Sequence, residues 1–333
     1  MDAVDPRIYS EAQDPVDQAA WVRARELAKT DPVAALPALR DVVERCPNLV
    51  RAHLAYQDAA LALAGTAEAE MLAYYHDLAQ GDTPVIDYVR ARLFETSYDR
   101  GTHLEKILAR DRSFGWAHLS LGRIRRGQGQ LLNAAEAFAA ALVFDPSLHE
   151  AHLERGDALA ELGRLQEAAV DYDAYFEAVP DDWPAMREYV ALLIYRLNRI
   201  DRALELLARL DVAAPGDLEL RMHRGAAMWR AFRPREALVH YLAVIEVDPG
   251  CSRALLDIGL IYYDAMSKDW TDDERRLWWP KARAAFKMFM ALGNPHDGHE
   301  SFERTLAVPY RLGVIAELLG PDDGQPAVAA DLR

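Results

Sequence analysis

The sequence predicts an all-α repeat protein, because three features share one period. Prolines that follow predicted helices recur at intervals of 34, 35 and 34 residues, at Pro146, Pro180, Pro215 and Pro249. A small residue, followed four positions later by an aromatic, keeps this spacing at Ala134 and Phe138, Ala168 and Tyr172, and Ala237 and Tyr241. A glycine lies 12 residues before each alanine, at Gly122, Gly156 and Gly225. Such a period is typical of stacked helix pairs, since one pair cannot bury its own apolar face.

Each repeated residue type has a physical reason to stand where it does. Glycine in the first helix and alanine in the second leave room for two antiparallel helices to approach closely. The aromatic, one helical turn after the alanine, is expected to fill the gap between this helix and the next pair. Proline follows the second helix because it cannot continue that helix but can begin the next one.

These positions carry a family resemblance. Residues 115–251 resemble four consecutive tetratricopeptide repeats (TPR), most clearly in WAHLSLGRIRRGQGQLLNAAEAFAAALVFDP and EAHLERGDALAELGRLQEAAVDYDAYFEAVP. The unit from Trp183 to Asp217 departs most from the pattern, since it has Val190 in place of the glycine and one extra residue. The resemblance implies a fold of stacked helix pairs through all four units.

Outside this block the pattern continues more loosely. The resemblance implies a right-handed α-α superhelical solenoid of about eight helix pairs, closed by a C-terminal capping helix. Residues 16–114 are expected to form degenerate pairs, residues 252–295 the last pair, and residues 296–320 the cap. Residues 1–15 and 321–333 are expected to be tails.

The last pair is expected to carry an insertion at about residues 267–279. Gly259 and Ala282 are separated by 23 positions rather than 12, so about 11 residues should leave the stack. Three acidic residues from position 272 favour the start of a short separate helix, and Pro280 would then open the second helix of the pair. The insertion holds three tryptophans that either contact a partner or fold back over the solenoid end: Trp270, Trp278 and Trp279.

In TPR proteins the first helix of each pair lines the concave face, and the resemblance places a protein-binding groove there. Its candidate residues are Trp116, Arg123, Arg126, Glu150, Glu154, Asp157, Arg187, Met222, Trp229 and Tyr263. The acidic stretch Glu150, Glu154, Asp157 and Glu161 favours a partner with a basic segment. Met222, Trp229 and Tyr263 form an apolar patch suited to a peptide, although Met222 could instead pack the neighbouring helix. The clamp that some TPR co-chaperones use for a terminal carboxylate is absent.

Charge, cysteine content and hydropathy narrow the possible partners and the expected location of the protein. The formal net charge of −15 disfavours nucleic acid as a partner. Cys46 and Cys251 have no metal-binding spacing and suit a reducing compartment, no apolar run approaches the length of a membrane span, and the acidic N-terminus is no secretory signal. We therefore expect a cytoplasmic protein with no membrane insertion.

Catalytic motifs and cofactor loops are not found, so no cofactor and no metal are expected. Two histidine clusters have spacings that could hold a metal but lack further ligands: His149 with His152, and His296 with His299 and Glu300. The function favoured is a non-catalytic scaffold or adaptor that binds a polypeptide segment in the groove. The alternatives are a metal-dependent or accessory enzyme that uses the His296 region, and a peptide-sensing regulator.

Overall fold

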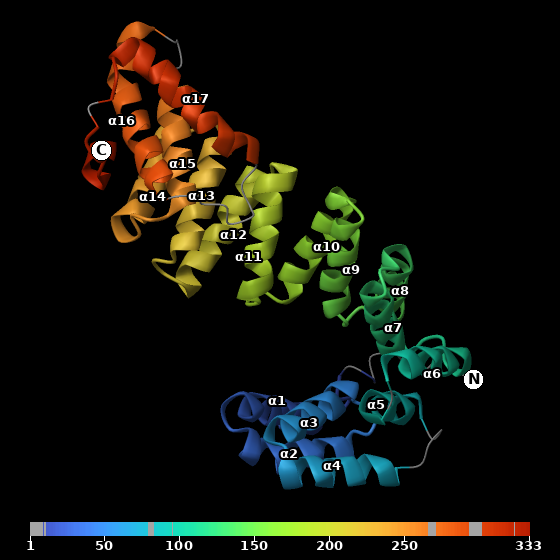
Figure 1. Cartoon of the computed structure of the whole chain (residues 1–333). Helices are drawn as coiled ribbons and strands as arrows, with labels where there is room; N and C mark the ends of the chain where they lie inside the picture. Colours follow the sequence, from blue (N-terminus) through green and yellow to red (C-terminus); the bar gives the residue numbers. More distant parts are fainter. Residues whose placement is uncertain are drawn as a thin grey trace. The chain divides into compact units, whose positions relative to one another are not determined.

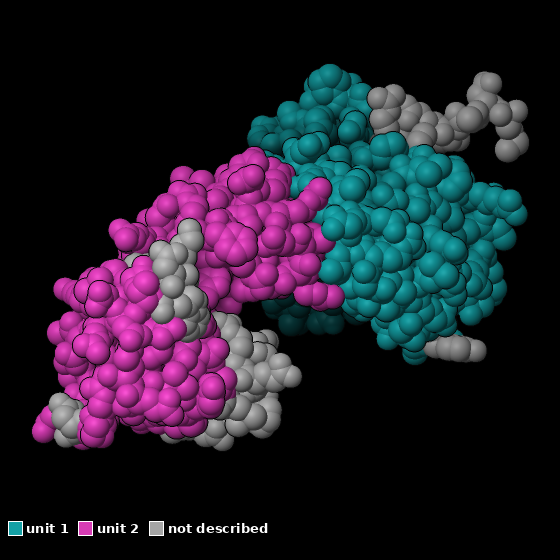
Figure 2. All heavy atoms as spheres, turned by 90° about the horizontal axis from the view of Figure 1, so that it is seen from above, with its two compact units in different colours: residues 1–181 teal, residues 182–333 magenta. Residues whose placement is uncertain are grey.

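The computed structural model describes residue 9 and residues 11–78, 83–94, 96–265, 271–292, 302–322 and 324–333. The chain divides into two compact units, Met1–Asp181 and Asp182–Arg333, shown in teal and magenta in Figure 2. Over the described residues the structure has 17 α-helices and no strand (Figure 1). This confirms the predicted all-α fold.

The helices of the first unit form five consecutive pairs. Their bounds are α1 Pro15–Thr30, α2 Pro32–Arg45, α3 Val50–Leu63, α4 Gly65–Asp77, α5 Pro84–Phe94, α6 Ser97–Arg110, α7 Gly115–Gly127, α8 Leu131–Phe144, α9 Glu150–Glu161 and α10 Leu165–Ala178. Each odd-numbered helix packs against the even-numbered helix that follows it. Asp14 and Asp31 cap α1 and α2 by accepting hydrogen bonds from the backbone N–H of Val16 and Ala34.

The second unit has three pairs and a further helix that closes them. Its bounds are α11 Trp183–Leu192, η2 Leu193–Leu197, α12 Ile200–Ala213, α13 Leu218–Arg230, α14 Pro234–Val247, α15 Ser252–Leu260, η3 Ile261–Ala265, α16 Asp272–Ala291, α17 Phe302–Leu319 and η4 Ala329–Leu332. Val308 and Ile315 of α17 are buried against the core of the last pair. The predicted count of eight helix pairs and a capping helix is therefore confirmed, with the cap beginning at Phe302 within the described residues.

The glycine and the aromatic of each repeat touch directly. A Cβ added to Gly122, Gly156 or Gly225 would lie 2.5, 2.9 or 2.6 Å from the ring of Phe138, Tyr172 or Tyr241, respectively. The same holds in the last pair, where a Cβ on Gly259 would lie 2.4 Å from Phe286. The ring thus fills space within its own pair, whereas the sequence led us to expect it beside the next pair. Only a residue without a side chain can accept a ring this close.

Substitution of Gly225 by alanine should therefore destabilise the protein. Alanine favours a helix over glycine by up to about 1 kcal/mol, but its Cβ would lie 2.6 Å from the Tyr241 ring. We expect the free energy of unfolding to fall by about 1–3 kcal/mol, as for other overpacked sites, measured by thermal unfolding followed by circular dichroism. Gly101→Ala is the matched control, because the nearest atom there is 3.9 Å away, and it should be neutral or stabilising. Equal stability of the two variants would contradict the close contact.

The divergent unit compensates for its missing glycine with a smaller partner. Val190 and the residue at the aromatic position, Leu207, are both fully buried, so two aliphatic side chains stand where the other repeats have a glycine and a ring. The first helix of this unit ends in the π-helical turn η2, where hydrogen bonds between residues i and i+5 take up one additional residue. The extra residue counted in the sequence is thus absorbed at the end of the first helix.

The insertion in the last pair does not form a separate short helix, and that prediction is wrong. Helix α16 runs without interruption from Asp272 to Ala291, with Pro280 in its interior rather than in its first turn. Thr271 caps it by accepting a hydrogen bond from the Glu274 backbone N–H at 3.3 Å. The inserted residues from 272 onward therefore lengthen the second helix of the pair, because the Thr271 cap and three acidic residues in the first turn begin the helix eight residues before Pro280.

The segment at residues 321–333 is not a free tail, which corrects the prediction. Leu332 is fully buried, and Tyr262 donates its hydroxyl to the Leu332 carbonyl oxygen at 2.7 Å. Arg333 pairs with Glu246 of α14. These contacts hold the last residues against α14, η3 and α16, as Figure 1 shows for the end marked C.

The N-terminal segment is also anchored at one of its described residues. Tyr9 is buried, its ring centroid lies 4.9 Å from that of Phe114 in an edge-on arrangement, and its hydroxyl donates to Asp111 at 3.3 Å. Burial, with the nearby Asp111 carboxylate, raises the pKa of Tyr9 to about 12. The predicted tail at residues 1–15 thus includes a residue that packs over 100 positions away in sequence.

Candidate functional site

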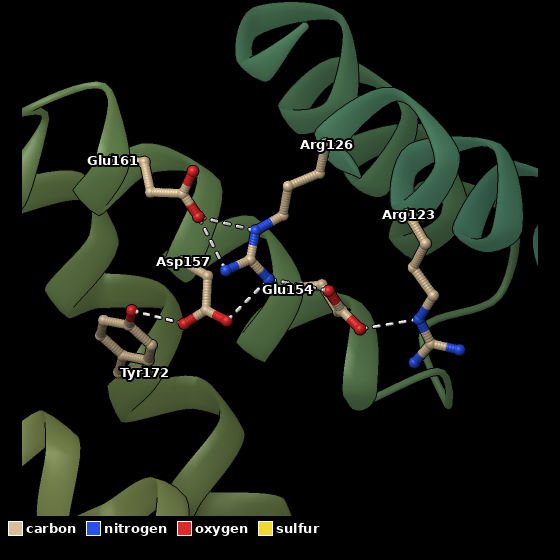
Figure 3. Close-up of polar contacts among 6 residues, drawn as sticks. All are labelled: Arg123, Arg126, Glu154, Asp157, Glu161 and Tyr172. Atoms are coloured by element: carbon tan, nitrogen blue, oxygen red, sulfur yellow. Dashed lines mark hydrogen bonds and ion pairs between the residues drawn. The ribbon is translucent and has the colours of Figure 1, made fainter. Parts of the chain in front are cut away.

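A network of charged side chains joins the first helices α7 and α9 of the first unit (Figure 3). The Arg126 guanidinium lies between three carboxylates of α9, at 3.2 Å from Glu154, 2.9 Å from Asp157 and 2.8 Å from Glu161. Arg123, one helical turn earlier, donates to Glu154 at 2.7 Å. The acidic residues recur every three or four positions along α9, so they share one face of that helix. We call this set, with Arg51 and Glu150, the first-helix surface.

Two further contacts hold this network in place. Tyr172 of α10 donates its hydroxyl to Asp157 at 2.8 Å, so the same ring that packs on Gly156 also orients a carboxylate of the surface (Figure 3). Burial alone would lower the pKa of Arg126, but its hydrogen bond to Glu161 and the charges of Asp157 and Glu161 outweigh this effect and raise the pKa. Arg126 therefore stays charged throughout the physiological range.

Arg51 of α3 extends the surface to a third first helix. Its guanidinium makes two hydrogen bonds to the Glu150 carboxylate, at 2.9 and 3.1 Å, and a third to the Ser147 carbonyl at 3.2 Å. It also lies over the Trp116 ring, 5.4 Å from the centroid. These partners are separated by nearly 100 positions in sequence. First helices from three different pairs therefore converge on one surface within the first unit.

The predicted acidic stretch is thus not a free acidic patch, and the sequence interpretation is corrected on this point. Its four carboxylates face three arginines of the same unit, Arg51, Arg123 and Arg126. The side chains remain 21–47% exposed, so each pair contributes little to stability, typically less than about 1 kcal/mol. Their effect is to fix the direction of donors and acceptors on a surface that is open to solvent.

The other predicted groove residues have different surroundings. Arg187 pairs with Asp217 at 2.6 Å and Glu219 at 3.4 Å, which ties α11 to the first turn of α13. Asp217 also caps α13, and the hydrogen bond from Arg187 is the main cause of its lowered pKa. Trp229 is partly buried.

The aromatic and methionine residues expected to face a partner lie mostly in the core. Trp116, Met222 and Tyr263 are only 4, 7 and 7% exposed. The Tyr263 ring stacks on the Trp279 ring at a centroid distance of 5.0 Å. The alternative that Met222 packs a neighbouring helix agrees with its burial, and these three side chains offer little surface to a partner.

The tryptophans of the insertion also pack inward where the structure describes them. Trp279 is 3% exposed and donates its indole N–H to the Tyr263 carbonyl at 3.3 Å. Trp278 is half-buried and stacks on Tyr262 at 5.9 Å. Both therefore cover the end of the last pair, whereas Trp270 lies outside the described residues.

A buried carboxylate that the sequence analysis did not single out binds His152, one of the two residues of the first histidine cluster. Asp171 of α10 accepts hydrogen bonds from His152 at 2.8 Å and from Arg155 at 2.7 and 2.5 Å. Burial would raise its pKa, but these two donors lower it. The available signal was an aspartate inside the otherwise apolar face of a second helix. Asp171 and Arg155 line an open hollow of about 430 Å³ among α8, α9 and α10, and the hydrogen bond to Asp171 occupies one ring nitrogen of His152.

Metal and thiol chemistry have little support among the described residues. They contain no group of three or more His, Cys, Asp or Glu side chains placed to hold a metal ion. Burial raises the pKa of Cys46 to about 11 and also raises that of Cys251, so both thiols stay protonated. His296, His299 and Glu300 lie outside the described residues. None of the described helices is long and apolar enough to cross a membrane.

The fold defines a helical-repeat protein in which partly exposed charged side chains of three first helices meet on one surface. Residues 114–182 match the family model described as the tetratricopeptide repeat. The matched residues form the helix pairs α7–α8 and α9–α10, so this part of the chain is a tetratricopeptide-repeat segment.

Three of the solved structures that match the chain are YrrB, MamA and PilF. YrrB, described as a TPR protein with an unusual peptide-binding site, is 18% identical over 62% of this chain and 97% of its own, with a TM-score of 0.47. MamA from Desulfovibrio magneticus RS-1 is 18% identical over 55% of this chain and 97% of its own, with a TM-score of 0.45. PilF from Pseudomonas aeruginosa is 18% identical over 63% and 87%, with a TM-score of 0.42. No curated protein sequence matches the chain.

Proposed function

We propose that this protein is a non-catalytic scaffold that binds a polypeptide segment along the first-helix surface of its first unit. The observation that carries the proposal is the convergence of α3, α7 and α9 on one network of partly exposed, mutually oriented charged groups. Such a surface presents donors and acceptors in fixed directions, so a segment laid across it need not reorganise them on binding.

The charges of the surface favour a mixed or mildly basic segment over a strongly basic one. Four carboxylates and three arginines leave a net charge of −1. Electrostatic complementarity of this kind mainly governs specificity and the rate of association. The binding energy must then come from apolar side chains of the partner that reach the rims of the network.

Site-specific crosslinking tests this proposal. A photo-reactive amino acid in place of Arg123, whose side chain is 46% exposed on α7, should capture a protein partner in cells. The matched control is the same amino acid at Val143, which is 76% exposed but lies on the second helix α8. We expect strong capture from position 123 and little from position 143, measured by mass spectrometry of the crosslinked species. Equal or greater capture from position 143 would contradict the proposed surface.

A further inference from the structure

Phe232 lies in a backbone conformation that phenylalanine rarely adopts. In four consecutive repeats the residue two positions before the second helix has a positive φ: Gly129 at +75°, Gly163 at +78°, Asn198 at +53° and Phe232 at +58°. Glycine and asparagine tolerate this left-handed region, whereas a bulky side chain is strained there. The fourth repeat therefore has the least suitable residue type of the four at this turn.

The packing of the folded protein does not explain why phenylalanine stands at position 232. The Phe232 side chain is 93% exposed, so no burial of apolar surface offsets the strain. Strained residues are found most often where a binding function needs them, and an exposed aromatic is a common anchor at protein interfaces.

The turn that holds Phe232 lies beside the preceding turn of the second unit. The Arg230 guanidinium at the end of α13 lies 5.6 Å from the ring centroid of Tyr195, which belongs to η2 at the end of α11. Residues 195–202 and 229–236 thus line one edge of this unit, which we call the turn edge. The turn edge includes helix ends as well as the two turns themselves.

The turn edge is basic in a strongly acidic chain. It contains six arginines against two carboxylates, Asp201 and Glu236, a net charge of +4, whereas the whole chain has −15. Arg196, Arg199, Arg230, Arg233 and Arg235 are all exposed. Arg233 forms a two-bond ion pair with Glu236, at 2.6 and 2.5 Å, which holds one guanidinium next to Phe232.

We propose that the turn edge is a second docking surface, and that it binds an acidic polypeptide segment with a large apolar side chain that packs on Phe232. Charge complementarity identifies the acidic partner, and the exposed ring identifies its apolar residue. A nucleic acid would meet the same arginines, but it would also meet the repulsion of the remaining chain, so a peptide is favoured. The surface is separate from the first-helix surface, which lies in the other unit.

Selection from a phage-displayed library of random 12-residue peptides tests the proposal. Peptides selected on the full chain should be enriched in Asp and Glu and should contain an aromatic or large aliphatic residue. Their binding should fall at least tenfold in Phe232→Asn, and also in Arg230→Glu combined with Arg235→Glu. Binding should weaken steeply as the salt concentration rises.

Two controls separate binding from folding. Asparagine tolerates the left-handed conformation, so Phe232→Asn should melt at the same or a higher temperature than the wild type. Val212→Asn, at another apolar side chain of the second unit that is 84% exposed, should bind the selected peptides unchanged. Selected peptides without acidic bias, undiminished binding to Phe232→Asn, or preferred binding of a fluorescent single-stranded RNA 20-mer would each overturn the proposal.

Discussion

Replacement of Phe138 by alanine should lower the free energy of unfolding by about 3–5 kcal/mol, as expected for the loss of a fully buried ring. Phe138 has no exposed surface and lies directly against Gly122, which has no side chain to move into the space left behind. The resulting cavity would lie between α7 and α8, in one of the two repeats that resemble the TPR pattern most clearly. Thermal unfolding and hydrogen exchange at the α7 and α8 amides would measure the loss.

The control for this variant lies on the same helix. Val143→Ala removes an apolar side chain that is 76% exposed, so stability should change by less than about 0.5 kcal/mol. Phe138→Leu keeps part of the volume and should cost less than Phe138→Ala. A loss in Phe138→Ala no greater than in Val143→Ala would show that the glycine–aromatic contact does not hold the pair together.

His53 should make the first unit sensitive to mild acid. Burial lowers its pKa from 6.5 to about 4. The ring lies between the Pro47 carbonyl, 3.0 Å from Nε2, and the Tyr75 hydroxyl, 2.9 Å from Nδ1. The carbonyl can only accept, so Nε2 carries the proton and Nδ1 accepts from Tyr75. Protonation of Nδ1 would add a second N–H and disrupt that hydrogen bond inside the core.

The direction of the pH effect follows from proton linkage. Because the pKa is lower in the folded state, the unfolded state binds the proton first, so the contribution to stability is complete above pH 6.5. As the pH falls from 6.5 to about 4, the free energy of unfolding should fall by about 3 kcal/mol in total. His53→Gln should remove this part of the slope of stability against pH, as measured by urea unfolding at several pH values. His76→Gln, at a 78% exposed side chain, should leave the slope unchanged, and an unchanged slope in His53→Gln would contradict the assignment.

The repeat itself could be predicted because its contacts lie at constant sequence spacing. Gly259 and Ala282 were assigned to the last pair from the repeat pattern despite the insertion between them, and Phe286, four residues after Ala282, packs on Gly259. The two helices of a pair are close in sequence and must pack against each other. Residue type and spacing therefore determine which residues of the pair touch. The insertion was predicted incorrectly because the Thr271 cap and the acidic first turn of residues 272–274 can begin one long helix that continues through Pro280 as readily as a short separate one.

The candidate site was harder to predict because it depends on contacts between different pairs. The sequence identified Arg126, Glu154, Asp157 and Glu161 correctly as residues of first helices, but it could not show that they neutralise one another. It also placed Trp116 on the binding face, whereas the ring is buried beneath Arg51 of a distant pair.

The sequence by itself determined the all-α repeat class, the eight helix pairs and the capping helix, since these follow from one period, whereas the structure showed that each aromatic ring packs on the glycine of its own pair. Only the tertiary structure decided which charges are paired, which aromatics are buried and which exposed side chain is strained. Arg51 reaches Glu150 through the stacking of intervening pairs, and the positive φ of Phe232 becomes visible only when its turn is compared with three others. The ion pair depends on how neighbouring pairs pack, because packing between pairs sets the distance between side chains that sequence spacing leaves open, whereas the φ angle of Phe232 is a property of one turn that only coordinates reveal.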